Sequence, residues 1–561
     1  MMNSLISWIL AIITAFSGLT QAASLSAAES FFTDAFSLLV QRSDFIDDIN
    51  DSDISVYGES AGFVDNTVLV FFEENASFFS KLDALKKSDG VTVGSLPEMN
   101  LCVVRTSDKT LDELLAFCDE LTMHEAVALA SICPAHKLDS QYTPDDPFTN
   151  SEWYEEKWSE VAPNGNNWWL EAVDARGAWG YNSLYGNIDI GIVDGGFDTD
   201  HVELDGKIRF PDSKSASRNR DNSHGTHVAG IIAAEGDNGV GICGLCQNAE
   251  LICLDWTPSD GQLWIADIEI FFGFTKVAKA GAKVINFSLG SSSSISDYAS
   301  SMPGFINNLD AMLYSYAMGS LLSKGYDFIV VQSAGNGNAA GYAVNASQNG
   351  VFCSINEGNT FLPFIGVGTK DILDRIIIVG SAALDKGGFV QSSSSNVGEI
   401  VDICAPGVMV YSCVQDDSYQ TKSGTSMATP VVTAVASLVW SVNPDLTAAQ
   451  VKQIVCENTC ATVDPSEERY FANAGYRAYP MVNAKLAVEA ALLMKSNTHK
   501  VSFSGIPAQT VTFTNAKGDE FVFETSMTGE LECVLPQGEY KVSHTGVDIT
   551  VTVDKDVTIG G

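Results

Sequence analysis

Short apolar segments recur along residues 160–497, separated by stretches with helical spacing, and this alternation limits the possible folds more than any other feature of the chain. The segments typical of buried strands are Ile188–Val193, Leu251–Leu254, Lys283–Phe287, Phe328–Gln332 and Ile376–Val379. Continuous apolar strands that alternate with helices form parallel sheets covered on both faces. We therefore predict an α/β domain with a parallel β-sheet flanked by helices.

The region before the predicted sheet has a different pattern. Residues 64–133 carry strand and helix signals in the order β-α-β-β-α-β, which is typical of a small α+β ferredoxin-like unit. The turn-rich cluster Thr143-Pro144-Asp145-Asp146-Pro147 then marks a boundary. We place the ferredoxin-like unit at residues 23–140 and the α/β domain at residues 141–497.

The last part of the chain changes character again. Its apolar side chains alternate with polar ones, as in Val501/Phe503 and Phe521/Phe523, and turn residues separate the runs. Half-buried strands joined by tight turns favour antiparallel pairing. We therefore predict a small all-β sandwich over residues 498–561.

The first residues indicate export. Leu5–Phe16 is an apolar run that is short for a membrane span, and Gln21-Ala22-Ala23 is typical of a cleavage site. We expect a signal peptide at residues 1–22 and a secreted, extracellular protein. No Lys or Arg precedes the run, so a buried N-terminal helix is the alternative. Because we find no other apolar span and no apolar C-terminal tail, we expect no transmembrane anchor.

The charge balance restricts the partners. The chain carries 70 acidic and 31 basic side chains, for a formal net charge of −39. Such a chain would be repelled by a polyanion, so we expect no nucleic acid partner. Structural calcium is compatible with so many carboxylates, although the sequence assigns no metal ligands. A solvated acidic surface without a specific ligand is the alternative.

The cysteines allow two interpretations. An exported protein with 12 cysteines can form disulfides, but their connectivity cannot be deduced from the sequence. Cys243-x-x-Cys246 also has the spacing of half a zinc site. No second half with matching spacing follows, so we interpret this pair as structural.

Two motifs contain the parts of an oriented base. Asp194 directly follows the apolar run that ends at Val193, at the end of a parallel strand where active sites form. His224 begins a helix rich in small residues, and its reference pKa suits a general base. Taken alone, Asp194 could simply cap a turn. His227 lies one turn after His224, and without a third ligand we interpret it as structural.

Two further motifs contain the parts of a nucleophilic site. Ser426 opens a predicted helix, where the dipole and unpaired N–H groups favour developing negative charge. Pro430 is tolerated if it lies in the first turn of that helix. Asn336 follows an apolar strand, and its side-chain amide could donate to an oxyanion together with the Ser426 backbone N–H. A helix-capping serine without chemistry is the alternative for Ser426.

Together these segments resemble the signature motifs of the subtilases, the subtilisin-like serine proteases. His224-Gly-Thr-His-Val-Ala-Gly230 and Gly424-Thr-Ser-Met-Ala-Thr-Pro430 follow the Asp194 motif in the order that is typical of the family. The resemblance covers about residues 150–495. It implies that Asp194 orients the base, His224 is the base, Ser426 is the nucleophile and Asn336 completes the oxyanion hole. Gly195 departs from the pattern, because Ser or Thr is common after the catalytic Asp.

The resemblance also implies how substrate and inhibitor bind. An extended peptide would pair with backbone near two segments, which are Ser288, Leu289 and Gly290 on one side and Ser333, Ala334 and Gly335 on the other. The unit at residues 23–140 is similar to subtilase propeptides, which assist folding and inhibit the enzyme until they are removed. We expect auto-cleavage between Ser131 and Tyr142. The C-terminal domain resembles small transthyretin-like sandwiches.

These features lead to one leading hypothesis. We predict a secreted serine endopeptidase that hydrolyses peptide or protein substrates through an acyl-enzyme and needs no cofactor for its chemistry. A catalytically weak or inactive subtilase-like binding protein is the alternative, with Gly195 as its support. An adhesion or structural protein carried by the C-terminal domain is a third interpretation.

Overall fold

The computed structural model describes residues 54–137 and 168–560, apart from short gaps. The gaps are residues 58–60, 74, 88–90, 97–98, 108, 214, 217–222, 237, 239–240, 258–263, 291–300, 338–342, 363–364, 386–387, 466–476, 506–509 and 545–546. The predicted signal peptide and the boundary cluster at residues 143–147 lie outside the described residues. The described chain forms two compact units: the first holds residues 64–133, and the second holds residues 54–63 and the residues from 134 onward.

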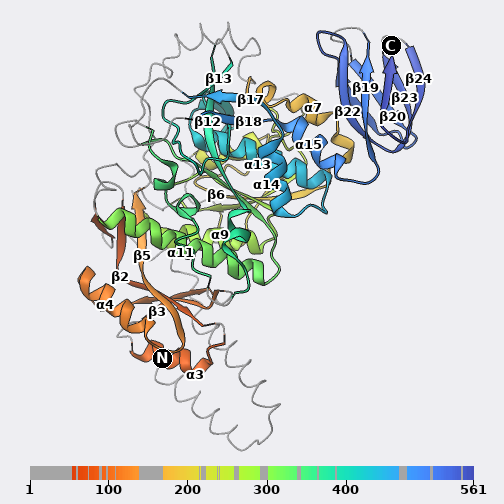
Figure 1. Cartoon of the computed structure of the whole chain (residues 1–561). Helices are drawn as coiled ribbons and strands as arrows, with labels where there is room; N and C mark the ends of the chain where they lie inside the picture. Colours follow the sequence, from red (N-terminus) through yellow and green to blue (C-terminus); the bar gives the residue numbers. More distant parts are fainter. Residues whose placement is uncertain are drawn as a thin grey trace, which may run out of the picture. The chain divides into compact units, whose positions relative to one another are not determined.

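The first unit has the predicted β-α-β-β-α-β order (Figure 1). Its elements are β2 (Ala61–Phe72), α3 (Phe78–Lys87), β3 (Val91–Leu96), β4 (Leu101–Arg105), α4 (Leu111–Thr122) and β5 (Val127–Lys137), and β1 (Ile54–Tyr57) precedes them. The strands lie in the order β3-β4-β2-β5. Helix α4 begins at a capping box, in which Glu113 N–H donates to Thr110 Oγ1 and Thr110 N–H donates to Glu113 Oε2.

The second unit contains the parallel sheet that the apolar segments predict. Its central strands lie in the order β12 (Ile376–Asp385), β11 (Ile329–Ser333), β10 (Val284–Phe287), β6 (Ile188–Asp194) and β8 (Ala249–Asp255), and each neighbouring pair is parallel. Further strands of this sheet are β7 (Ile208–Arg209), β13 (Gly388–Gln391), β14 (Ile403–Pro406), β17 (Thr459–Asp464) and β18 (Tyr479–Val482), whereas the short strand β9 (Trp264–Ala266) lies outside it. Parallel strands bring their carboxyl ends to one side, so the residues after β6, β10 and β11 become neighbours.

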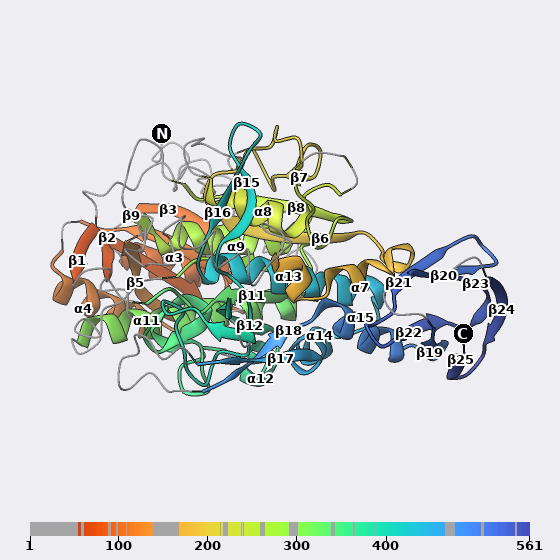
Figure 2. The same cartoon turned by 90° about the horizontal axis from the view of Figure 1, so that it is seen from above.

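Helices cover both faces of this sheet (Figure 2). The helices and 3₁₀ turns are α6 (Trp168–Ala172), α7 (Ala175–Trp179), η6 (Asn182–Leu184), α8 (His224–Ala233), α9 (Asp267–Lys279), α11 (Ser301–Ser323), η8 (Ala346–Gln348), η9 (Val351–Ser354), α12 (Thr369–Leu373), α13 (Thr425–Val442), α14 (Ala448–Glu457) and α15 (Ala484–Leu493). Ile190 and Ile192 of β6 share one core with α8 and α13. Position 191 faces the opposite side of the sheet. A Cβ added to Gly191 would lie 2.1 Å from the Val277 side chain of α9.

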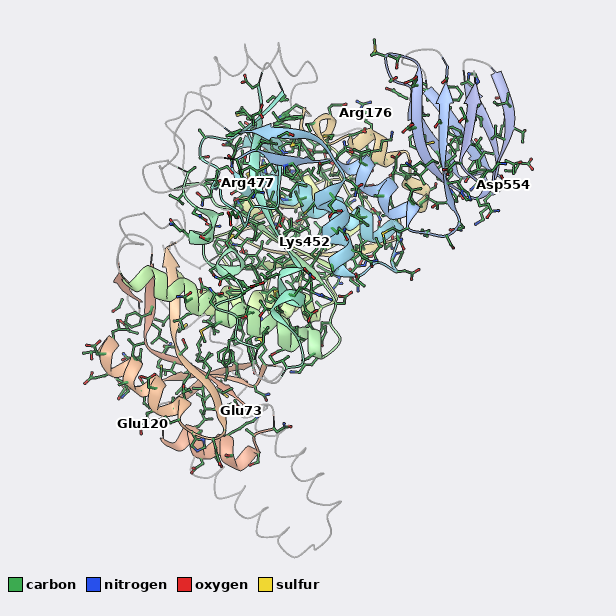
Figure 3. All side chains as sticks on the ribbon, in the orientation of Figure 1. Glu73, Glu120, Arg176, Lys452, Arg477 and Asp554 are labelled. Atoms are coloured by element: carbon green, nitrogen blue, oxygen red, sulfur yellow. The ribbon has the colours of Figure 1, made fainter. Side chains whose placement is uncertain are left out.

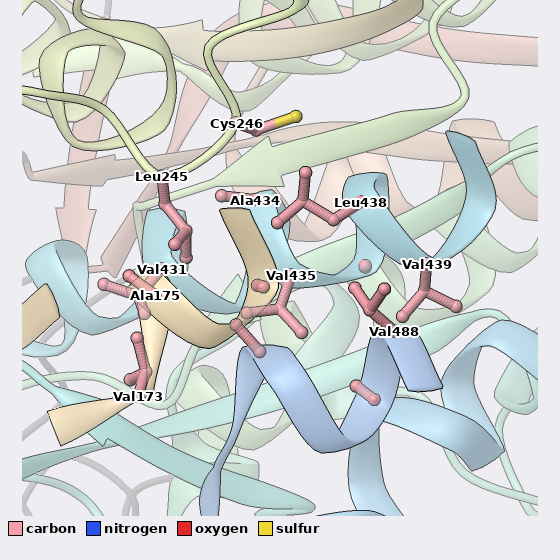
Figure 4. Packing of buried hydrophobic residues seen from close by; sticks show 14 of the residues in the cluster. Val173, Ala175, Leu245, Cys246, Val431, Ala434, Val435, Leu438, Val439 and Val488 are labelled. Carbon is pink, nitrogen blue, oxygen red and sulfur yellow. The ribbon is translucent and has the colours of Figure 1, made fainter. Parts of the chain in front are cut away.

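Helix α13 is the centre of the core on its face of the sheet. Almost all of its side chains are buried. Figure 4 shows Val431, Val435 and Val439 of α13 in one cluster with Ala175 and with Val488 of α15. Burial of each such side chain contributes roughly 1.5–3 kcal/mol. This packing fixes the helix whose first turn carries Ser426.

Basic side chains are scarce, and some of them join elements of the scaffold. Lys452 of α14, labelled in Figure 3, lies with its Nζ 3.0 Å from Asp402 Oδ1 and donates to the Leu373 carbonyl at 3.3 Å. Arg176, also labelled, pairs with Glu171 at 2.8 Å on the surface. Exposed pairs of this kind contribute about 0–1 kcal/mol each.

The C-terminal strands form two sheets within the second unit. One sheet has the order β22 (Glu530–Pro536), β19 (Thr498–Ser504) and β25 (Val557–Gly560), and the other has β21 (Glu520–Glu524), β20 (Thr510–Asn515), β23 (Gly538–His544) and β24 (Val547–Val553). The buried Tyr181 joins them to α15, because its hydroxyl accepts from Val534 N–H at 2.9 Å and donates to Glu489 at 2.7 Å. Its ring lies 5.0 Å from that of Phe523.

The structure shows the state of the cysteines, which the sequence analysis left open. No disulfide is formed among the described residues, and most of the cysteines are buried in separate parts of the core. Burial raises the pKa of Cys246 to about 12, so this side chain behaves as a small apolar group. Cys243 and Cys246 instead hydrogen-bond to nearby backbone and amide groups.

Candidate active site

Asp194 and His224 meet at the carboxyl end of β6. Asp194 is the last residue of the strand, and its side chain is only 1% exposed. His224 begins α8 with 30% of its side chain exposed, and its Nδ1 lies 2.6 Å from Asp194 Oδ1. An ionised carboxylate can only accept, so Nδ1 carries the proton and Nε2 carries the lone pair of the neutral ring. The pair is therefore an oriented and partly exposed base.

The loop after β6 is tied to the first turn of α8. Gly225 N–H donates to the Gly195 carbonyl at 2.8 Å, and Thr226 N–H donates to the Gly196 carbonyl at 2.9 Å. Asp198 N–H donates to Thr226 Oγ1 at 2.9 Å. A Cβ on Gly225 would lie 2.8 Å from the Gly196 carbonyl oxygen, so glycine is needed for this approach. These contacts hold His224 against Asp194.

Other residues of the His224 motif pack α8 against the hairpin of β15 (Val410–Val414) and β16 (Ser418–Lys422). His227 Nε2 lies 2.9 Å from the Gln420 carbonyl, and burial holds the pKa of His227 well below its ordinary value. Ser412 Oγ donates to the His227 carbonyl at 2.7 Å. A Cβ on Gly230 would lie 2.4 Å from Ser412 Oγ. The geometry supports the interpretation that His227 is structural.

Ser426 is the second residue of α13. Its Oγ donates to the Ser288 carbonyl at 3.3 Å, and Ser288 Oγ donates to the Ser426 carbonyl at 2.9 Å. Pro430 explains the second bond, because it lacks the N–H that would otherwise reach the Ser426 carbonyl four residues earlier. The prediction that Pro430 lies in the first turn is wrong, since α13 begins at Thr425. The proline is accommodated because Ser288 satisfies the freed carbonyl.

Asn336 is fixed beside the same helix end. Its Oδ1 accepts from Thr425 N–H at 2.8 Å and from Thr425 Oγ1 at 3.0 Å. A backbone N–H can only donate, so its partner must be Oδ1, and Nδ2 remains as the donor. Gly335 N–H donates to Thr425 Oγ1 at 3.2 Å, and the φ of +95° at Gly335 favours glycine. Thr425 is the residue before Ser426. The side-chain N–H groups of Asn336 are therefore held next to the start of α13, where Ser426 lies.

The segments that carry His224 and Ser426 are joined by Lys422, which the sequence analysis did not single out. Lys422 ends β16, and its Nζ donates at 2.7 Å to Oγ of Ser223, the residue before His224. Burial lowers the pKa of Lys422 to about 8, and the negative charge of Asp194 opposes this shift. No motif marks this lysine, because its role depends on a contact across 199 residues.

The predicted substrate-binding residues are neighbours in space. Ser288, Leu289 and Gly290 follow β10, while Ser333 ends β11 and is followed by Ala334 and Gly335. The two strands pair in parallel as far as Phe287 and Gln332. Beyond this point Ser333 Oγ donates to the Leu289 carbonyl at 3.2 Å. The structure thus places the two predicted segments side by side.

Two asparagines that hold the turn after β11 were missed. Asn396 Nδ2 donates to the Ala334 carbonyl at 2.9 Å, and Asn396 N–H donates to the Gly335 carbonyl at 2.8 Å. Asn349 Nδ2 donates to the Ser333 carbonyl at 3.0 Å. In the sequence both are single asparagines in loop-like stretches, so no local signal could have identified them.

Gly195 contributes backbone only. Its N–H donates to Asp194 Oδ1 at 2.7 Å, so the departure from the family pattern leaves this contact in place. The second carboxylate oxygen of Asp194 is buried without a hydrogen-bond partner among the described residues. The orientation of Asp194 therefore depends on Gly195 N–H and on His224.

The described residues contain no group of three or more His, Cys, Asp or Glu side chains that could hold a metal ion. Calcium ligands thus remain unassigned. Within the same part of the chain, α13 is the one helix long and apolar enough to cross a membrane by length and composition, and 94% of it is buried in the protein. These features are typical of a core helix.

Comparisons with known proteins show which family the chain resembles. A family model described as the Subtilase family matches residues 186–485. Thermitase from Thermoactinomyces vulgaris is 30% identical over 356 residues, which are 62% of this chain and 100% of thermitase. A thermophilic serine proteinase from Bacillus sp. (strain AK1) is 27% identical over 394 residues, which are 70% of this chain and 81% of that protein.

A solved structure has a similar fold. The crystal structure of fervidolysin from Fervidobacterium pennivorans, described as a keratinolytic enzyme related to subtilisin, matches with a TM-score of 0.51. The match has 18% sequence identity and covers 90% of this chain and 79% of fervidolysin. At this identity the likeness concerns the fold alone.

Proposed function

This chain belongs to the subtilase family and is a subtilisin-like serine protease, and we propose that it is a secreted endopeptidase with Asp194, His224 and Ser426 as its catalytic triad. The observation that carries the proposal is the 2.6 Å contact between His224 Nδ1 and the buried Asp194. A base oriented in this way can activate a neighbouring hydroxyl nucleophile. We assign this role to Ser426, which begins α13, and the hydrogen bond between Lys422 and Ser223 joins its segment to that of His224.

The proposed reaction follows the serine protease template. His224 Nε2 accepts the Ser426 proton while Ser426 Oγ attacks the scissile carbonyl, and Asp194 stabilises the resulting imidazolium. The imidazolium then protonates the leaving amine, and water hydrolyses the acyl-enzyme with His224 again as the base. No cofactor takes part in these steps. Activity should fall in acid as the imidazole becomes protonated, and a rate that stays flat from acid to neutral pH would contradict this role for His224.

The oxyanion is held by Asn336 and by backbone at the start of α13. The side-chain oxygen of Asn336 already accepts hydrogen bonds from Thr425 N–H and Thr425 Oγ1. The Nδ2 group can therefore donate to the developing negative charge. The Ser426 N–H adds a second donor at the positive end of the helix dipole. Both donors are fixed before substrate binds, which is the condition for electrostatic stabilisation of the transition state.

The experiment that tests the proposal is casein hydrolysis by the secreted protein, beside Ser426→Ala, with a serine-directed fluorophosphonate label on both. We expect label and activity in the wild type and neither in the variant. Ser423→Ala is the matched control, because it alters another serine just before α13 and should keep both signals. A folded wild type, free of residues 23–140, that neither labels nor cleaves would instead support the inactive binding protein.

We further propose that residues 1–22 direct export and that residues 23–140 form an inhibitory propeptide that assists folding. Two observations support this: residues 64–133 form a compact unit by themselves, and the elements of this region follow the β-α-β-β-α-β order that the sequence predicted. N-terminal sequencing of secreted protein should give a start after Ser131. A start at Ala23 or Ser24 would contradict processing.

A further inference from the structure

The side chain that precedes the scissile bond must fit between two backbone segments. The attacked carbonyl lies near Ser426 Oγ, which is 3.3 Å from the Ser288 carbonyl, and near Asn336. The residue that carries this carbonyl therefore lies between the segment that begins at Ser288 and the segment that leads to Asn336. The parallel pairing of β10 and β11 has ended by this point, so a space can open between the two segments.

Asn349 fills the inner part of this space. A Cβ on Gly290 would lie 2.2 Å from Asn349 Nδ2, and a Cβ on Gly335 would lie 2.4 Å from Asn349 Oδ1. One amide group is therefore in contact with glycines of both segments. The Asn349 side chain is itself 3% exposed. It occupies the volume that a long side chain of the substrate would need.

The amide cannot easily move away. Asn349 Nδ2 donates to the Ser333 carbonyl at 3.0 Å, and Asn349 N–H donates to the Ala346 carbonyl at 2.9 Å. Phe352, three residues later, has its ring 5.1 Å from that of Phe287 in β10. Moving Asn349 would break a buried hydrogen bond and disturb this aromatic packing, which together cost more than a substrate methylene gains.

We propose that Asn349 is a specificity-determining residue that limits the side chain before the scissile bond to a small one, namely that of Gly, Ala or Ser. The inference rests on the proposed function, because it takes the segments after β10 and β11 as the substrate-binding ones. An aromatic or long aliphatic side chain would have to displace the Asn349 amide. A small side chain fits above it and leaves the Ser333 hydrogen bond intact.

The test compares processed full-length wild type with Asn349→Ala on succinyl-Ala-Ala-Pro-X p-nitroanilides, where X is Ala, Leu or Phe. Fluorophosphonate titration gives the concentration of active sites. We expect the wild type to favour Ala over Phe in kcat/KM by about 10–100-fold, and the variant to reduce this ratio by about 10-fold or more through a gain on Phe.

Asn396→Ala is the matched control. Asn396 supports the same turn through the Ala334 carbonyl, and its Nδ2 would lie 2.5 Å from a Cβ on Gly335, but it is not among the nearest groups to Gly290. Its loss should lower kcat/KM on all three substrates and leave their ratio unchanged. A ratio that changes equally in both variants would mean that a loosened turn, and not the filled space, sets the preference.

The outcomes separate the two proposals. A labelled, active wild type that prefers Phe or Leu would overturn the role of Asn349, even if Asn349→Ala fails to fold. A wild type that takes no label and cleaves no substrate would instead overturn the proposed function. Preference for Ala in the wild type, together with the gain on Phe in Asn349→Ala, would support both.

Discussion

The site consists of two halves that are built in different ways. The acid–base half, Asp194 and His224, is joined by a direct side-chain contact between a strand and a helix 30 residues apart. The oxyanion half, Ser426 and Asn336, is held indirectly, because Asn336 bonds to Thr425 across 89 residues and not to Ser426. Short motifs mark Asp194, His224 and Ser426, whereas the position of Asn336 depends on a contact between distant segments. If this contrast is correct, loss of a group in the first half should depend less on supporting residues than loss of a group in the second half.

After Ser426→Ala, the largest loss is expected from Asp194→Asn. The amide would favour the wrong tautomer of His224, so kcat should fall by about 10⁴-fold, the size of the loss in the Ser-His-Asp template. Hydrolysis of a p-nitroanilide at neutral pH measures the effect. Asp198→Asn is the control in the same loop, since the Asp198 carboxylate accepts from the backbone N–H groups of Asp200 and Asp416, and an amide oxygen can accept in the same way. A loss below 10-fold for Asp194→Asn would contradict the assigned role.

Asn336→Ala should cost less. Removing one oxyanion donor lowers kcat by about 10²–10³-fold, a magnitude that comes from subtilisin, a relative of this chain, and not from its own structure. KM should change little, because the donor acts mainly in the transition state. Asn345→Ala, which removes a cap of η8, provides a matched control that should retain activity. A rise in KM with kcat unchanged would assign Asn336 to substrate binding instead.

Thr425→Val tests whether the oxyanion half depends on its support. The variant removes the hydroxyl between Asn336 and Gly335 and leaves the buried Gly335 N–H without its acceptor. We expect kcat to fall by about 10-fold and stability by about 1–3 kcal/mol. Thr429→Val removes a hydroxyl that donates to the Thr425 carbonyl at 2.7 Å within the helix, and it should affect stability without affecting kcat. Equal kcat in both variants would show that Asn336 needs no such support.

The smallest effect on activity is expected from Lys422→Met, which acts where the two halves meet. The pKa of Lys422 is about 8 in the folded protein, and that of an unfolded lysine is about 10.4. Between these pH values the unfolded chain binds more protons, so the stability of the wild type should rise with pH. Below pH about 8 the buried ammonium is unfavourable, and the variant should be more stable by about 1–2 kcal/mol.

Thermal unfolding of Lys422→Met and the wild type across this pH range measures the difference. The advantage of the variant should shrink as the pH approaches the unfolded value, because the wild-type lysine is then neutral in the folded protein. Lys452→Met is a control at the Asp402 ion pair, far along the chain from the site. A variant that is less stable than the wild type at neutral pH would mean that the Ser223 hydrogen bond outweighs the burial of the charge.

Much of the molecule was predictable from the sequence. The apolar runs predicted the five central strands of the parallel sheet, since a strand buried on both faces must be apolar throughout. The short motifs identified Asp194, His224 and Ser426, because glycines and small residues around them are required by local close approach, as at Gly225. The state of the cysteines could not be predicted, because the sequence shows that cysteines exist but not where they lie.

The sequence by itself determined the type of sheet, the order of the reactive side chains and the family to which the chain belongs. Only the tertiary structure decided how these side chains are supported: Thr425 fixes Asn336, Ser288 satisfies the carbonyl that Pro430 frees, and Asn349 fills the space between Gly290 and Gly335. The physical reason is the range of the interactions. Periodicity and local motifs record contacts within a few turns, whereas these supports are formed by single side chains that meet only after the sheet has brought distant loops together.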